Sequence, residues 1–456
     1  MSDKIDRSIE KLSRPEIRNL QFKKLKEMLE RIYNTNEFYK QRFKAAKVHP
    51  DDIKSFEDFH ARIPTLSKED CLQEQVKYPP YGRRAGVTEE DIFQIQLTSG
   101  TSGKGQEVFV ITRDDAAVAA RSWATWFTWA GVVKGDVVYN FFPMATGSAG
   151  LSLYDAFKYL EANTILAASY DVDTKISYMT RFRPHYMMTT PSYLMRLTVV
   201  CKEKGVDPRK DMARLKGILI AAEGYPVEWA ERMREFWGAT LHEMYGSTQY
   251  NGTLACTCEN GVTSNGKRNS LHVLEHFAYV EVNDPETGRP VQYGDDGEVV
   301  LTTFSRTGSP VVRFTTKDKV RLLPPDNCNC GRPFMTWETG TISRYDDMIK
   351  MKATNIWPNT VDEIIFSYDE VEESHGTVLI DDQGKERVKV EIEFKDGVSL
   401  DIENRILKSI AQKIKSKTDV SMEVERVNRG TLKRSELKAR RWTDARKGAL
   451  ERISKI

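Results

Sequence analysis

The chain has 456 residues, 40% of them hydrophobic and 10% aromatic, and its formal net charge at pH 7 is +2. This length exceeds what a single hydrophobic core supports and predicts two or three domains, while the small net charge excludes attraction to nucleic acid by bulk electrostatics. The polar amino terminus lacks the apolar core of a signal peptide, and no stretch approaches the roughly 18 apolar residues of a membrane span. We therefore expect a cytoplasmic protein without a membrane partner.

The spacing of apolar residues predicts the first elements in chain order. Residues 15–33 carry apolar positions at helical spacing, and from about residue 90 short apolar runs alternate with helical stretches. Buried strands that alternate with helices favour a largely parallel α/β sheet. The strands expected in this part are 136–142, 164–169, 186–190 and 217–224, with helices at 192–204 and 227–236.

The C-terminal part has a different pattern. A more β-rich section begins at 297–304, and residues 387–394 alternate strictly between helical patterns at 359–367 and 402–415. We therefore expect an α/β fold with a large N-terminal domain, residues 1–345, of mixed, largely parallel sheets with a β-rich section, and a small mobile α+β domain, residues 346–456. The apolar face of the alternating strand comprises Val388, Val390, Ile392 and Phe394.

Residues 97–105, LTSGTSGKG, combine three glycines, four hydroxyl side chains and one lysine. Glycine lets backbone amides approach an anion, the hydroxyl groups donate hydrogen bonds, and Lys104 adds positive charge. The spacing GxxGK is two residues shorter than the Walker A loop GxxxxGK[ST]. The segment therefore predicts a polyphosphate loop of another kind, the alternative being an ordinary surface turn rich in glycine, serine and threonine.

Four of the six cysteines form two CxC pairs, Cys256 with Cys258 and Cys328 with Cys330. In a reducing compartment, clustered cysteines argue for a metal rather than for disulfides. Zinc requires four thiolate or imidazole ligands in a tetrahedron, so the two pairs can share one site only if the fold brings them together. Free cysteines in β-turns are the alternative.

The chain from Arg429 onward holds ten Lys or Arg residues against three Asp or Glu. A solvated basic helix is the ordinary explanation of such a run. Within it, Lys438 lies beside an acidic residue and several arginines on a small domain that could move. A flexible point charge of this kind suits an oxyanion that appears only during a reaction.

Several segments match known motifs. LTSGTSGKG is similar to SSGTTGKP, AAEG (221–224) to GAEP, and YGSTQ (245–249) to YG[LS][ST]E. RFTTKD (313–318) is similar to RYRTRD, SRYDDMIKMKATNIWP (343–358) to GRSDDMLIIRGVNVFP, and RSELKA (434–439) to RSEGKA. With NTNEFYKQRF (34–43) and TPSYLMRL (190–197), they keep one order from residue 34 to 439. Through these motifs the chain resembles the acyl-adenylate-forming enzymes, specifically the phenylacetate–CoA ligase branch.

The resemblance implies a nucleotide site. The loop from Thr98 to Lys104 would hold the β and γ phosphates of ATP, Thr248 would touch the α-phosphate, and Asp318 would accept hydrogen bonds from both ribose hydroxyls. Arg344 would contact the ribose or a phosphate. The full set implied for the nucleotide is Thr98, Ser99, Gly100, Thr101, Ser102, Gly103, Lys104, Ala222, Glu223, Gly224, Tyr245, Gly246, Ser247, Thr248, Gln249, Asp318 and Arg344.

The resemblance also implies a reaction in two steps. A carboxylic acid would be activated by ATP and Mg²⁺ as acyl-AMP, and the acyl group would pass to coenzyme A. Lys438 and Thr248 would be catalytic, with Lys438 bridging the attacking carboxylate and the α-phosphate, and Asp346 would be the hinge of the small domain. Aromatic walls favour an aryl or arylacetic acid. The wall residues expected are Phe141, Phe142, Tyr193 and Tyr250.

Three positions depart from the family pattern. The motif glutamate, commonly a magnesium ligand, is Gln249, and a neutral amide binds magnesium more weakly than a carboxylate. The glycine of the thiolation loop is Ala353, whose methyl group could narrow the path of the CoA thiol. The proline that ends the phosphate loop is Gly105.

The ligase branch carries a zinc knuckle, which maps here to Cys258, His272, Cys328 and Cys330. Cys256 could replace His272 and make a four-cysteine site. With all four positions filled by protein, the zinc would be structural.

Three alternatives remain at this stage. An adenylating enzyme could pass its acyl group to a carrier protein or another acceptor instead of CoA. A nucleic-acid-binding module could form around the knuckle and the basic tail, although the small net charge and the ordered motifs stand against it. An inactive relative is the third, against which Lys438 and Asp318 argue. Relatives of this kind often dimerise, so a homodimer is a further expectation.

Overall fold

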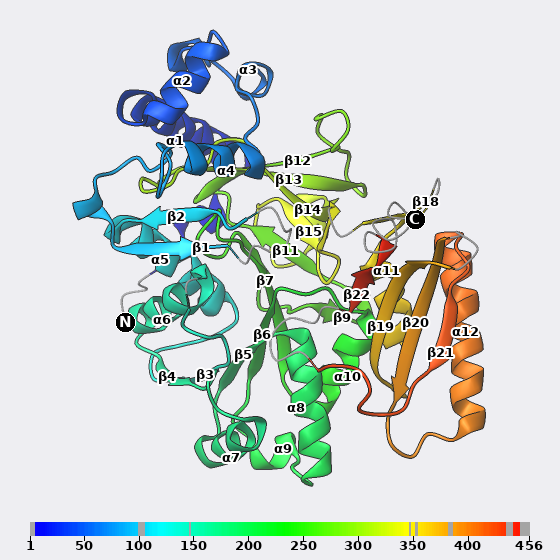
Figure 1. Cartoon of the computed structure of the whole chain (residues 1–456). Helices are drawn as coiled ribbons and strands as arrows, with labels where there is room; N and C mark the ends of the chain where they lie inside the picture. The colour runs from blue at the N-terminus through cyan, green and yellow to red at the C-terminus, as the bar shows by residue number, and fades with distance from the viewer. Residues whose placement is uncertain are drawn as a thin grey trace.

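In the computed structural model, which describes residues 5–98, 105–145, 147–345, 348–351, 354–381, 386–434 and 441–446, the chain begins with a helical layer. Helix α1 (Arg14–Thr35) confirms the helix expected at 15–33, and a capping box between Ser13 and Glu16 fixes its start. Figure 1 shows this layer in blue beside the strands β12 and β13. Its other elements are α2 (Glu37–Ala45), α3 (Phe56–Arg62), α4 (Lys68–Lys77) and the short 3₁₀ turns η1 (Ser8–Lys11), η2 (Pro50–Asp52) and η3 (Glu89–Asp91).

A two-stranded antiparallel hairpin follows the helical layer. Strands β1 (Gln94–Leu97) and β2 (Val108–Ile111) end on the pair of Leu97 with Val108. One residue further, the amide of Thr98 donates to the carbonyl of Glu107 at 3.1 Å. The hairpin therefore closes the base of the expected phosphate loop, of which residues 99–104 lie outside the described part of the chain.

A twelve-stranded sheet forms the centre of the large domain. Five neighbouring strands, in the order β4–β3–β5–β6–β7, pair in parallel, which confirms the parallel α/β part expected from the sequence. The four strands expected between 136 and 224 are all present. The bounds are β3 (Val137–Asn140), β4 (Asn163–Leu166), β5 (Tyr186–Thr189), β6 (Gly217–Ala221) and β7 (Thr240–Tyr245).

Helices cover both faces of this parallel part. Val138 and Leu219 point toward α5 and α6, whereas their sequence neighbours Tyr139 and Ile218 point toward α7, α8 and α10. Because successive residues alternate between two buried faces, these strands need continuous apolar runs. The helices are α5 (Arg113–Trp129), α6 (Ser148–Leu160), α7 (Val172–Phe182), α8 (Pro191–Glu203), α9 (Pro208–Asp211) and α10 (Val227–Trp237).

Antiparallel strands extend the sheet beyond β7 in the order β8–β11–β15–β14–β13–β12, with β16 paired to β14. This section confirms the β-rich stretch expected from 297–304. It packs on the helical layer, where Tyr279 stacks on Phe56 with ring centroids 4.6 Å apart. The bounds are β8 (Ala255–Cys256), β9 (Thr263–Ser264), β10 (Lys267–Arg268), β11 (Ser270–Val273), β12 (Ala278–Asn283), β13 (Asp296–Thr303), β14 (Phe314–Leu323), η4 (Pro325–Asn327), β15 (Thr336–Glu338) and β16 (Ser343–Arg344).

The smaller C-terminal domain has its own four-stranded sheet, in the order β21–β20–β19–β22. Val388, Val390 and Ile392 on β20 point into a core shared with α11 and α12, as the alternation predicts. Strand β16 pairs with the large-domain strand β14, whereas β17 pairs with β18. The elements are β17 (Ile349–Met351), β18 (Thr354–Ile356), α11 (Pro358–Phe366), β19 (Val371–Ile380), β20 (Glu386–Phe394), α12 (Leu400–Thr418), β21 (Glu423–Arg426) and β22 (Trp442–Asp444).

The small domain lies beside α8 and α10 of the large domain (Figure 1). The Arg232 guanidinium on α10 donates to the carbonyl oxygens of Phe366 (2.7 Å) and Ser367 (3.2 Å), and Arg268 forms an ion pair with Glu363 at 3.0 Å. The interface combines these polar contacts with Met195 of α8, which packs against the core of the small domain. Among the described helices, none has the length and apolar character needed to cross a bilayer.

Candidate functional site

The segments singled out in the sequence meet where parallel strands end. Residues 221–224 follow β6, residues 246–250 follow β7, and the carboxyl end of each parallel strand in an open α/β sheet faces the same edge. Asp318 on β14 and the base of the β1–β2 hairpin lie against the same turn, as the contacts below show. This edge is where such folds bind ligands.

Tyr245, Asp318 and Arg344 form one contact group. The Tyr245 hydroxyl donates to Oδ2 of Asp318 at 2.5 Å, and Nη1 of Arg344 donates to Oδ1 of the same carboxylate at 3.3 Å. Burial and the Asp318 charge raise the pKa of Tyr245 well above its usual value, so the phenol stays protonated and donates. Three residues separated by up to 99 positions in the chain therefore share one carboxylate.

The segment after β6 makes a sharp turn. Ala222 has a φ of +78°, a left-handed conformation that is uncommon for a residue with a side chain. A Cβ on Gly224 would lie 3.0 Å from the carbonyl oxygen of Gly340, so only glycine fits this approach without a shift. The turn thus places the end of β6 in close contact with Gly340, in the segment that leads to the small domain.

Glu223 has a contact that the sequence did not suggest. Its Oε2 accepts hydrogen bonds from the amide (2.9 Å) and the hydroxyl (2.5 Å) of Ser192, in the first turn of α8. Negative charge at a helix amino terminus is stabilising. The carboxylate expected to line the adenine therefore also anchors α8.

The turn that carries Ser247, Thr248 and Gln249 is clamped by a buried arginine. Arg306 donates from Nη1 to the carbonyl oxygen of Thr248 at 3.0 Å and also to that of Gln249. Burial lowers the pKa of Arg306 to about 9. Sequence reasoning missed Arg306, because a single arginine after a strand carries no motif.

A second contact joins this turn to the hairpin. Gln249 donates from Nε2 to Oε2 of Glu107 at 2.7 Å. Two residues later, Asn251 accepts from Nε2 of Gln96 on β1 at 2.9 Å. The hydroxyl of Thr98 accepts from the Glu107 amide at 2.9 Å. The base of the hairpin that bears the expected phosphate loop and the YGSTQ turn therefore lie side by side, with Glu107 between them.

The structure does not gather the four aromatic residues expected around the acyl group. Phe141 and Tyr193 pack on each other, with centroids 5.5 Å apart, on the α7–α8 face of the sheet. Phe142 packs on the opposite, α5–α6 face. Tyr250 lies in the core beside the helical layer and borders a cavity of only about 20 Å³ with Phe277.

Several predicted residues lie outside the described residues. They are Ser99, Gly100, Thr101, Ser102, Gly103 and Lys104 in the loop, Asp346 at the expected hinge, Ala353, and Lys438.

The residues on either side of Lys438 are anchored near the site. Arg434 pairs with Glu372 at 3.1 Å, and Arg441 donates from Nη2 to the Ser192 hydroxyl at 3.3 Å. Ser192 is the residue that binds Glu223 at the end of β6. Both ends of the segment 435–440 therefore lie where the small domain faces α8.

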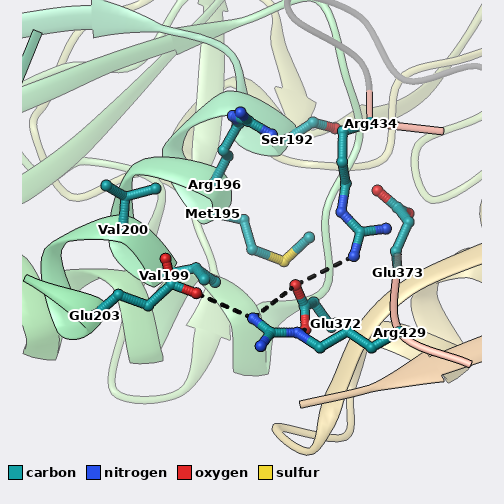
Figure 2. Close-up of a pocket in the computed structure, with 10 residues that line it drawn as sticks. All are labelled: Ser192, Met195, Arg196, Val199, Val200, Glu203, Glu372, Glu373, Arg429 and Arg434. Atoms are coloured by element: carbon teal, nitrogen blue, oxygen red, sulfur yellow. Dashed lines mark hydrogen bonds and ion pairs between the residues drawn. The ribbon is translucent and has the colours of Figure 1, made fainter. Parts of the chain in front are cut away.

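A cavity of about 180 Å³ separates α8 from the small domain (Figure 2). Arg429 crosses it, with Nη2 at 3.1 Å from Glu203 of α8 and Nε at 2.6 Å from Glu372 of β19. The Arg429–Glu203 pair, which joins the two domains, is partly exposed on both sides and therefore contributes at most about 1 kcal/mol. Contacts of this strength hold two domains together without locking them.

Cys258, His272, Cys328 and Cys330 form one cluster, with ligand atoms all within 4.8 Å of one another. The sulfurs of Cys258 and Cys328 are 3.7 Å apart, and Nε2 of His272 is 3.4 Å from the Cys330 sulfur. A tetrahedral zinc ion with bonds of about 2.0–2.3 Å separates its ligands by roughly 3.6–3.8 Å. The geometry therefore fits a zinc ion. Among the described residues, Cys256 pairs with His272 across β8 and β11 but is not part of this cluster.

Two family models match this chain. The family described as "AMP-binding enzyme" matches residues 34–305, and "AMP-binding enzyme C-terminal domain" matches residues 353–446. The chain is 29% identical over 428 residues to a phenylacetate-coenzyme A ligase of Pseudomonas putida, covering 93% of both chains. It is 30% identical over 361 residues to a phenylacetate-coenzyme A ligase of Aromatoleum evansii, covering 78% of this chain and 77% of the relative.

Among solved structures, the fold is similar to a 2-hydroxyisobutyryl-CoA ligase. Its postadenylation state with a bound adenylate superposes with a TM-score of 0.85, at 23% identity, covering 98% of this chain and 94% of the other. The thioesterification state of the same enzyme gives a TM-score of 0.70 at 22% identity and the same coverage. The arrangement of the two domains here is therefore closer to the first state.

Gly246 offers a test of how tightly the YGSTQ turn is packed. A Cβ at this position would lie 2.1 Å from the Gly252 carbonyl oxygen and 2.9 Å from the terminal methyl of Met244. Gly246→Ala should therefore lower the free energy of unfolding by about 1–3 kcal/mol in urea titrations, because the turn must shift. The matched control is Gly147→Ala, where the added carbon meets nothing within 4 Å; equal losses in the two variants would contradict the tight packing.

Proposed function

Because the chain belongs to the family of AMP-binding enzymes, we propose that it activates a carboxylic acid as acyl-AMP with ATP and then transfers the acyl group to coenzyme A. The first step forms a bond between a carboxylate oxygen and the α-phosphorus of ATP and releases pyrophosphate. In the second step the CoA sulfur attacks the acyl carbon, loses its proton, and AMP leaves. One site would serve both steps.

One observation carries the proposal for the nucleotide. The hairpin that bears the Gly-, Ser- and Thr-rich loop lies directly against the turn of residues 247–249. Asp318 accepts a hydrogen bond from Tyr245, the last residue of the strand that leads into this turn. In the proposed complex the loop holds the phosphates, Thr248 contacts the α-phosphate, and Asp318 accepts from the ribose. Transfer at phosphorus depends on positioning and charge neutralisation more than on covalent chemistry by the protein.

Magnesium would be held by ATP oxygens and by the side-chain oxygen of Gln249, and it would supply positive charge to the phosphates. The Gln249 side chain suits this role because its amide nitrogen donates to Glu107, so that its amide oxygen can face a cation. Lys104 and Lys438 are proposed as the two lysines that neutralise the same phosphates.

We propose that Lys438 reaches the nucleotide when the small domain is docked as it is here. Support comes from the residues that flank it, since Arg434 and Arg441 are both anchored beside α8 and Arg441 contacts Ser192. The small domain, proposed to begin at residue 346, would then turn about Asp346 and withdraw Lys438. The weak ion pair of Arg429 with Glu203 across the domain gap is compatible with such a movement.

The acid is proposed to be aromatic or arylacetic. The support is the identity of the two curated relatives, both phenylacetate-coenzyme A ligases. Of the expected wall residues, Phe142 and Tyr250 are retained, because Phe141 and Tyr193 are occupied with each other on the other face of the sheet. Transfer to a carrier protein stays an alternative with no observation in its favour.

The four-residue cluster is proposed to hold a structural zinc ion with three thiolates and one imidazole, which is a common structural donor set. It would join the turn after β8 to β11 and to the loop at residues 328–330. We also infer a cytoplasmic enzyme that acts on small molecules rather than on nucleic acid or membranes, with a homodimer as the proposed assembly.

Release of pyrophosphate tests the activity itself. A panel of benzoic, phenylacetic, short aliphatic and 2-hydroxy acids is incubated with ATP and Mg²⁺, with and without CoA. We expect pyrophosphate with at least one aromatic or arylacetic acid, and AMP with a CoA thioester only when CoA is present. If no acid provokes pyrophosphate release, the proposed function is wrong.

Lys438→Ala tests the assignment of the catalytic lysine. Loss of one partner of a developing oxyanion should slow adenylation by about a hundredfold or more, while thioester formation from preformed acyl-AMP should change far less. The control is Lys433→Ala, an exposed lysine five positions earlier on the same segment, which should change neither step. Equal losses in both steps for Lys438→Ala would contradict the proposed domain movement.

Metal analysis tests the zinc proposal. The purified protein should carry about one zinc per chain, and Cys330→Ser should lose most of it and melt at a lower temperature, because a structural site contributes directly to folding. Cys256→Ser is the control, since Cys256 lies outside the cluster. A Cys330→Ser protein that keeps a full equivalent of zinc would argue against this ligand set.

A further inference from the structure

Glu107 is a fully buried carboxylate at the base of the phosphate-loop hairpin. Its exposed fraction is 0%, and among the residues that the structure describes its Oε1 has no hydrogen-bond partner. Burial raises the pKa of Glu107. A buried carboxylate with an unmatched oxygen costs stability, so its presence calls for a function.

Among the described residues, the partner of this side chain is Gln249, whose Nε2 donates to Oε2 of Glu107 at 2.7 Å. The carboxyl oxygen accepts this hydrogen bond, so it faces the NH₂ side of the Gln249 amide. The oxygen of Gln249 must then point away from Glu107. Gln249 is partly exposed at the turn beside the phosphate loop, so this oxygen is available to a ligand.

Glu107 might instead serve only to balance two buried arginines, and the contacts argue against that role. Arg84 and Arg306 lower its pKa through their charge, yet each guanidinium lies over the ring of Phe109, at 4.4 and 4.8 Å. In the described part of the chain, Arg84 donates to the carbonyl oxygen of Val108 at 3.4 Å and Arg306 to that of Thr248 at 3.0 Å. The side chain is thus turned toward Gln249 rather than toward its nearest cations.

We propose that Glu107 is a positioning residue for the metal–nucleotide complex, which holds the amide of Gln249 so that its oxygen faces the cation on the ATP phosphates. The inference rests on the proposed function. Position 249 is where the family pattern has a carboxylate, and here the carboxylate lies one contact further away. The pair divides the task between a neutral oxygen ligand and a buried charge that orients and polarises it.

The same contact changes what Gln249→Glu is expected to do. Two carboxylates would then meet at about the distance of the present hydrogen bond, and one would have to take up a proton or move. The single substitution therefore introduces repulsion in addition to a better metal ligand. Exchange of both side chains, Glu107→Gln with Gln249→Glu, keeps the donor–acceptor pair and its volume and moves the charge to the metal side.

The experiment uses the full-length protein without any carboxylic acid, so that no reaction occurs. Equilibrium dialysis measures the affinity for ATP with Mn²⁺ and with EDTA, and the water-proton relaxation rate of bound Mn²⁺–ATP gives a spectroscopic readout. The variants are Glu107→Gln, Gln249→Glu and the exchanged pair. Glu243→Gln is the matched control, because Glu243 is an equally buried carboxylate on β7 that binds Tyr225 and Gly340 instead.

In wild type, Mn²⁺ should strengthen ATP binding. Glu107→Gln should reduce that gain by about tenfold or more, the usual effect of removing an outer partner of a metal ligand, and leave the affinity in EDTA unchanged. The exchanged pair should restore the gain, and Glu243→Gln should keep it. Gln249→Glu alone should melt at a lower temperature in EDTA than the exchanged pair.

Three results would overturn the inference. The first is a Glu107→Gln protein with the full Mn²⁺ gain. The second is an exchanged pair that melts normally but fails to recover the gain, and this variant decides the question if Glu107→Gln does not fold. The third is equal loss in Glu107→Gln and Glu243→Gln, which would mark a general effect of buried charge. A wild-type protein that binds no ATP under either condition would instead refute the proposed function.

Discussion

The hydrogen bond between Gln249 and Glu107 joins two segments that are 142 residues apart in the chain, at 2.7 Å. It fixes the hairpin that bears the proposed phosphate loop against the turn that follows β7. Arg306 reinforces the same turn by binding its carbonyl oxygens. The remaining site depends on this junction, because the loop, the turn and the carboxylate of Asp318 can form one nucleotide site only if these segments keep their relative positions.

The surrounding fold supports that junction from two directions. Strands β6 and β7 are buried on both faces and end at the site, so their continuous apolar runs set where the turns begin. Close backbone contacts at Gly246 leave little room for those turns to move. The small domain, in contrast, is held by polar and partly exposed contacts such as that of Arg429 with Glu203. The ends of β6 and β7, where the nucleotide is proposed to bind, are thus held by tight packing. The small domain that faces them is held by weaker contacts.

Sequence reasoning predicted the elements well because their apolar periods are long and regular, as in β5, β6, α8 and β20. It also named the group of Tyr245, Asp318 and Arg344, since each lies in a motif with fixed spacing, and the four residues of the metal cluster. It could not find Glu107 or Arg306, because their roles depend on contacts between distant segments. Glutamine at 249, where the family pattern has glutamate, directed attention to this position, but the sequence alone could not single out Glu107 among 66 acidic residues. The aromatic wall residues stay a prediction: Phe141 and Tyr193 pack on each other on one face of the sheet, whereas Phe142 packs on the other.

The most direct test of the account is a crystal structure with ATP and Mn²⁺ in which anomalous scattering locates the metal. The account predicts the triphosphate beside residues 98–105 and an Mn²⁺ peak within bonding distance of the Gln249 side-chain oxygen, with the Gln249 nitrogen still on Glu107. A triphosphate remote from the hairpin, or a metal peak with the Gln249 amide turned the other way, would contradict it.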